Sequence, residues 1–98
     1  MAHMLAKLKG VKVEEIGKVL KADASVHAEQ GFFLQHLWQN VDDSEEVLFL
    51  FRSDDLNRAK QFVYKVHAQA RNQDPHANLP EITFLEEKEA GSTKKGLS

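Results

Sequence analysis

Residues 46–51 read Glu-Val-Leu-Phe-Leu-Phe, with five apolar side chains in a row. In a β-strand, successive side chains point to opposite faces, so the odd-numbered residues would face one way and the two leucines the other. A helix is the competing interpretation. The run is short, however, and ends at the polar segment 53–55, which favours a buried strand. Both faces of that strand are apolar and need cover, because burying one such side chain stabilises by about 1.5–3 kcal/mol.

Strand and helix patterns alternate before this stretch. Residues 4–8 predict a first strand that Gly10 ends. Between residues 13 and 30, apolar residues recur at three- and four-residue steps, which predicts one helix that Gly31 ends. Residues 32–39 predict a second strand. Its strict alternation would place Phe32, Leu34, His36 and Trp38 on one face and Phe33, Gln35, Leu37 and Gln39 on the other.

The remaining elements follow the same logic. A polar turn at residues 40–44 would join the second strand to the third as a hairpin. Residues 53–55 supply an N-cap for a second helix, which should end near residue 74 because Pro75 disfavours helical geometry in the residue before it. The apolar stripe expected on this helix is Leu56, Ala59, Phe62, Val63, Val66 and Ala70. Residues 82–85 predict a fourth strand. We expect a single domain over residues 1–88 and a disordered tail over residues 89–98, which has no apolar anchor.

The predicted order β-α-β-β-α-β is that of the ferredoxin-like α+β sandwich, in which two helices cover one face of a four-stranded antiparallel sheet. Nothing in the chain is then left to cover the second face, although that face also carries large apolar residues. A second copy with two-fold symmetry would cover it, which predicts a homodimer through the sheet face. The pattern leaves open which parity of residues 46–51 faces the helices, since a register slip by one residue reverses it.

Composition narrows the class of protein. The 98 residues hold 13 basic and 15 acidic side chains, a net charge of -2, so no basic field favours nucleic acid or an anionic membrane. No apolar run approaches the roughly 20 residues of a transmembrane helix, and the first residues do not resemble a secretory signal. There is no cysteine, which excludes disulfides and thiolate chemistry but leaves the redox compartment open. We therefore expect a cytoplasmic protein without a nucleic-acid or membrane partner.

Three segments carry a resemblance to a known superfamily: residues 41–47, residues 54–62 and residues 80–86. Their acidic turn, aspartate-capped helix and closing strand, in this order and spacing, resemble small uncharacterised proteins of the dimeric α+β barrel superfamily. These are related to antibiotic-biosynthesis monooxygenase domains, and the resemblance covers roughly residues 4–87. It implies the fold and the dimer. Relatives in that superfamily include cofactor-independent oxygenases, haem-binding enzymes and isomerases, with ligands generally held between the sheet and the helices. No catalytic signature of that superfamily is recognised here.

Five side chains are candidates for a ligand site. His36 and Trp38 lie two residues apart on one strand face, where an imidazole and a stacking ring would serve a flat ligand if that face lay under the helices. The alternative is a half-buried histidine with a core or interface tryptophan. His27 falls late in the first helix, where it would reach the cavity or interact with the last carbonyls of its helix. Arg52 and Tyr64 would orient a polar ligand, or else pair with the nearby acids and flank the apolar stripe.

The sequence predicts no metal site, because no three or four ligands converge at a recognisable spacing. No bound cofactor is expected either; haem is an alternative only through a single axial histidine, His27 or His36. His67 and His76 are interpreted as surface groups. The first hypothesis for function is a homodimer that binds a small apolar or aromatic molecule in a cavity between sheet and helices. The alternatives are a cofactor-independent monooxygenase-like enzyme and a non-catalytic assembly or interaction module, so whether the chain is an enzyme is left open.

Overall fold

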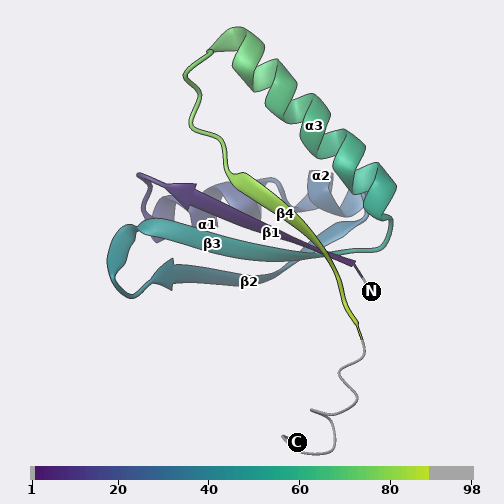
Figure 1. Cartoon of the computed structure of the whole chain (residues 1–98), viewed down its shortest axis with the longest axis horizontal. Coiled ribbons are helices and arrows are strands. Elements are labelled where there is room, and N and C mark those ends of the chain that lie inside the picture. Colours follow the sequence, from purple (N-terminus) through teal and green to yellow (C-terminus); the bar gives the residue numbers. More distant parts are fainter. Residues whose placement is uncertain (1, 89–98) are drawn as a thin grey trace, which may run out of the picture.

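The computed structural model describes residues 2–88, which form a four-stranded sheet with three helices (Figure 1). The elements in chain order are β1 (Ala2–Lys9), α1 (Val13–Ala22), α2 (Ala24–Glu29), β2 (Phe32–Asn40), β3 (Asp43–Ser53), α3 (Leu56–Gln73) and β4 (Glu81–Glu86). The strands lie in the order β2-β3-β1-β4, and every neighbouring pair is antiparallel. The predicted ferredoxin-like arrangement is confirmed, with β3 and β1 at the centre of the sheet.

Pairing between the central strands decides which face of the sheet the helices cover. Met4 pairs with Phe51 and Ala6 with Phe49, and all four are buried. They belong to a core that also includes residues of the helices: Met4, Ala6, Leu20, Phe32, Val47, Phe49, Phe51, Ala59 and Val63. The odd-numbered residues of 47–51 therefore lie beneath the helices. Leu48 and Leu50 point to the face without helices, here called the uncovered face.

The predicted alternation along residues 32–39 is wrong, because β2 contains a bulge. Leu34 pairs with Phe51 whereas His36 pairs with Leu50, so Gln35 is an extra residue that shifts the register. A bulged residue leaves the ladder locally unpaired and changes the face to which the following side chains point. Phe32, Leu34 and Leu37 consequently share the helix-covered side, and Phe33, His36 and Trp38 share the uncovered face.

The single helix expected over residues 13–30 is two helices, separated at Asp23. The Asp23 backbone N–H donates to the carbonyl of Val19, and its own carbonyl accepts from the N–H of His27. Aspartate is a poor residue for a helix interior, which accounts for a break here. Gly31 ends the helical segment as predicted, here after α2, with a positive φ of 81° that glycine adopts without strain. Val19 and Val26, two of the apolar residues at helical spacing between residues 13 and 30, are exposed.

α3 begins and ends close to the predicted positions. The Asp55 side chain accepts a hydrogen bond from the backbone N–H of Arg58 at 3.1 Å, which confirms the N-cap. Its apolar face contributes Ala59 and Val63 to the core. The helix runs diagonally from the end of β3, and its C-terminal end projects beyond β4 (Figure 1).

The hairpin between β2 and β3 is tighter than predicted, because only Val41 and Asp42 lie outside the strands. Asn40 supports this turn: its Oδ1 accepts from the backbone N–H of Asp42, and its Nδ2 donates to Glu46 Oε1, each at 2.8 Å. Val41 at the tip is 97% exposed. The predicted disordered tail, residues 89–98, lies outside the described residues, and the domain boundary at residue 88 stays a prediction.

Candidate functional site

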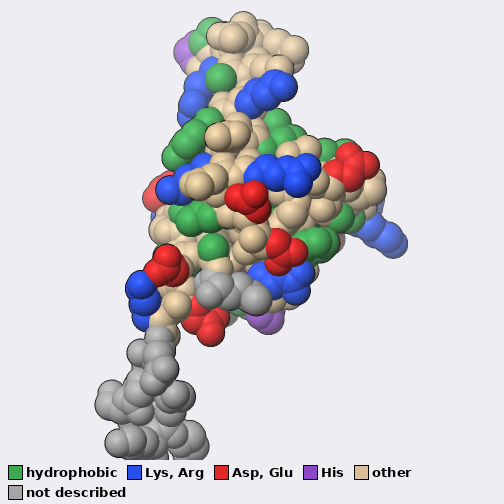
Figure 2. All heavy atoms as spheres, turned by 90° about the vertical axis from the view of Figure 1, so that its right-hand side faces the viewer, with side chains coloured by type: hydrophobic (Ala, Val, Ile, Leu, Met, Phe, Trp, Pro, Cys, Tyr) green, Lys and Arg blue, Asp and Glu red, His purple; other side chains and the backbone are tan. Residues whose placement is uncertain are grey.

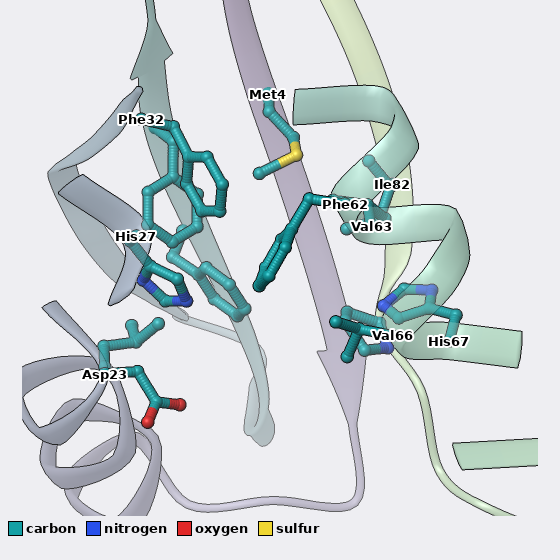
Figure 3. Close-up of a pocket in the computed structure, with 13 residues that line it drawn as sticks. Met4, Asp23, His27, Phe32, Phe62, Val63, Val66, His67 and Ile82 are labelled. Atoms are coloured by element: carbon teal, nitrogen blue, oxygen red, sulfur yellow. The ribbon is translucent and has the colours of Figure 1, made fainter. Parts of the chain in front are cut away.

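A pocket of about 170 Å³ opens between the sheet and the helices. It lies between α1 and α2 on one side and α3 on the other, with the buried faces of β1 and β3 as its floor (Figure 3). Its lining residues are Met4, Leu20, Asp23, His27, Phe32, Phe49, Phe51, Phe62, Val63, Val66, His67, Pro80 and Ile82. Most of these side chains are apolar, so the pocket suits an apolar ligand oriented by few polar groups.

Aromatic rings form much of the pocket wall. The His27 ring stacks on Phe32 with centroids 4.7 Å apart, and Phe51 meets both rings edge-on at 5.2 Å. Phe62 approaches from α3, with its ring 5.6 Å from that of Phe32. Aromatic pairs at such distances and tilts stabilise one another beyond the area they bury. The wall is therefore a packed cluster of rings that would meet a flat ligand face-on or edge-on.

Two histidines reach the pocket from opposite sides, His27 from α2 and His67 from α3 (Figure 3). Burial lowers the pKa of His27, and the nearby Asp23 carboxylate offsets part of that effect. Burial also lowers the pKa of His67, and the positive charge of Arg71 lowers it further. Both imidazoles are thus neutral at neutral pH, and a neutral imidazole can accept a proton from a ligand or donate a hydrogen bond to it.

The structure places the five predicted site residues in three separate regions. His27 alone lines the pocket. His36 and Trp38 stack on each other, with ring centroids 5.0 Å apart, on the uncovered face. These two side chains do not line the cavity beneath the helices, because the bulge at Gln35 directs them to the opposite face of the sheet.

Arg52 and Tyr64 also lie away from the pocket. Arg52 pairs with His3 on the uncovered face; its guanidinium lies 4.7 Å from the centre of the Phe33 ring, and its Nε is 3.4 Å from Asp54 Oδ1. Its pairing with an acid of the following turn is the alternative that the sequence had left open. Tyr64 is 60% exposed on α3, with its ring edge-on to Phe84.

The sequence interpretation missed the residues that face His27 across the pocket. The sequence predicts His67 as a surface group, yet it lines the pocket. Its position four residues after Val63, a buried member of the α3 stripe, was the available signal, because residues four apart lie on the same helical face. Phe62 had been placed in the stripe, but nothing in its spacing indicated that it would border a pocket.

Metal ligands, pocket volume, helix hydropathy and surface charge add few further constraints on what the protein binds. Among residues 2–88, no three His, Asp or Glu side chains come together as a metal site would require. This pocket alone is close in volume to cavities of about 150 Å³ that hold benzene, and a haem macrocycle is larger than that. No helix within the described part of the chain is long and apolar enough to span a membrane. On the face shown in Figure 2, basic and acidic side chains are interspersed with apolar ones.

Comparison with known proteins identifies shared architecture. No family model matches the sequence, and no curated protein matches it. A crystal structure from Deinococcus radiodurans, of a "putative antibiotic biosynthesis monooxygenase", superposes with a TM-score of 0.60 at 20% identity, over 92% of this chain and 95% of that one. An uncharacterized NIPSNAP domain protein from Burkholderia xenovorans superposes with a TM-score of 0.56 at 17% identity, over 92% of this chain and 97% of that one. The chain therefore shares the ferredoxin-like α+β fold of these two proteins, as its sequence resemblance had implied.

Proposed function

We propose that this protein binds a small apolar or aromatic molecule in the pocket between the sheet and the helices. The observation that carries the proposal is the pocket wall, in which the rings of Phe32 and Phe51 meet the half-buried His27 and the ring of Phe62 meets Phe32. A cavity of about 150 Å³ lined by similar side chains stays dry and binds benzene. At about 170 Å³, the pocket would take a molecule with one aromatic ring, and the neutral imidazoles would select one with a hydroxyl group.

Phenol is a suitable first probe for this proposal. Titration into ¹⁵N-labelled protein should shift backbone amides of residues that line the pocket, and Val66→Trp should abolish those shifts by filling it. Val26→Trp is the matched control, since Val26 is a helix valine of similar exposure, 44% against 39%, and does not line the pocket. Unchanged spectra of the parent protein at the highest phenol concentration tested would refute ligand binding at this pocket.

The proposal includes a homodimer, supported by the residues that the uncovered face presents. Leucines and aromatic rings occupy much of it, and Trp38 and Leu85 are 44% and 41% exposed. One end is charged, where Lys7 lies 3.9 Å from Glu81. Contiguous exposed apolar surface with a polar rim is typical of protein–protein interfaces. A second copy presents the same surface, so a two-fold axis through this face would cover both sheets at once.

A second candidate function is oxidation of a phenol by molecular oxygen without a bound cofactor. It is favoured by the neutral imidazoles at the pocket and by the name of the Deinococcus neighbour. His27 would take the phenolic proton, which makes the ring electron-rich. The ring would supply all four electrons: one oxygen atom of O₂ enters it to give a quinone, and the other leaves as water. Oxygen uptake with a panel of phenols would test this, and binding without uptake would leave only the first function.

A further inference from the structure

We propose that the ligand site continues past His27 into a second apolar compartment beneath α1, and that His27 is the partition between the two. The second compartment has a volume of about 400 Å³ and lies between α1–α2 and the edge strand β2. It is lined by Gly17, Leu20, Lys21, Ala24, His27, Phe32, Phe33, Leu34 and Leu37. This inference rests on the proposed binding function and assigns to it a larger class of ligand.

Three residues line both compartments and form the wall between them: Leu20, His27 and Phe32. Leu20 and Phe32 are 6% and 2% exposed and belong to the core. His27 differs from them, because it is only half-buried and sits on the six-residue helix α2, next to the break at Asp23. Its ring is held against Phe32 and Phe51. A rotation of this one side chain would join the compartments without disturbing the two core residues.

Volume supports a joined site. Pockets for drug-sized ligands occupy about 300–1,000 Å³, and the first compartment alone, at about 170 Å³, falls below that range. A ligand of that size would need the second compartment, which at about 400 Å³ lies within the range. The bulge at Gln35 contributes, because it places both Leu34 and Leu37 on the helix-covered side, where they line the second compartment. The geometry fits an elongated ligand with two or three fused rings, of which at least one would lie in each compartment.

A pair of probes tests this directly. Phenol has one ring and 2-naphthol has two, and both can be titrated into ¹⁵N-labelled protein. We expect phenol to shift the amide of Val66 in the first compartment, and 2-naphthol to shift that amide together with the amide of Gly17 in the second. Shifts confined to the first compartment with both probes would overturn the inference while leaving the proposed function intact. Binding of neither probe would overturn both.

A substitution gives an independent readout. Leu34 lines only the second compartment and is 42% exposed, so Leu34→Trp should fill that compartment without disrupting the core. We expect at least tenfold weaker binding of 2-naphthol and less than twofold change for phenol. Val26→Trp, which touches neither compartment, should change neither affinity. Equal affinities of the parent and Leu34→Trp for 2-naphthol would contradict the second compartment as part of the site.

Discussion

Trp38 offers the sharpest test of the proposed homodimer, through the substitution Trp38→Ala. It is the single tryptophan of the chain, lies on the uncovered face opposite Leu48, and stacks on His36. In the isolated chain its side chain is 44% exposed although it is large and apolar. If a second copy covers this face, Trp38 would be buried twice in each dimer, and its removal should weaken association more than that of any smaller side chain.

The size of the effect follows from the exposed area. An exposure of 44% on a side chain of about 250 Å² leaves about 110 Å² to be buried. At about 25 cal/mol per Å², this corresponds to about 2.5–3 kcal/mol in each subunit, or about 5–6 kcal/mol in a symmetric dimer. Every 1.4 kcal/mol is a factor of ten, so Trp38→Ala should raise the dimer Kd by a factor on the order of 10⁴.

Sedimentation equilibrium over a dilution series would measure this shift. Trp38 fluorescence in the parent protein should move to longer wavelength as dimers dissociate, because the indole then meets water. Tyr64→Ala is the matched control, since Tyr64 is a 60% exposed aromatic residue on the helix layer, and its removal should leave the Kd unchanged. A parent protein that stays monomeric at the highest concentration would refute the reasoning, as would a Trp38→Ala variant with the parent's Kd.

Three further predictions concern stability. Phe51→Ala should lower the free energy of unfolding by about 3–5 kcal/mol in urea titrations, because Phe51 is 3% exposed and packs among other rings. Leu50→Ala, on the uncovered face, should lower the stability of the monomer by less. Asp55→Ala removes the N-cap of α3 and should cost about 0.5–2 kcal/mol, measured as a lowered thermal midpoint. The lowered pKa values of His27 and His67 mean that the unfolded chain binds protons first, so stability should fall as pH drops below about 6.5, and His27→Gln should flatten that slope in urea midpoints.

Much of the fold follows from local patterns in the sequence. The run at residues 46–51, the cap at Asp55 and the stop at Gly31 each act through neighbours close in the chain, and each is found where predicted. The parity of the central strand could not be predicted, because both of its faces are apolar. The bulge at Gln35 could not be predicted either, because no glycine or proline lies at this point of the strand and the register depends on pairing with β3.

The site was harder to predict than the fold. His27 reaches the pocket because α2 packs over Phe32, and its place late in the first predicted helix had made it a candidate for the cavity. The partners that face it come from α3, some forty residues later in the chain, and only tertiary packing brings them together. His36 and Trp38 were grouped correctly with each other, since residues two apart share a strand face. Their assignment to a layer depended on the bulge between them and Phe32.

The number of residues in β2, and not their chemistry, decides which side chains face the helices and which face the uncovered side, because Gln35 is an extra residue. Deleting Gln35 would exchange the faces of all side chains from His36 to the hairpin. Trp38 would then point inward beneath α1, and Leu37 and Gln39 would point to the uncovered face. No substitution at a single position could exchange the two surfaces so completely. Insertions and deletions at this point are therefore the mutations by which a close relative could keep the same architecture and trade its assembly for a different cavity.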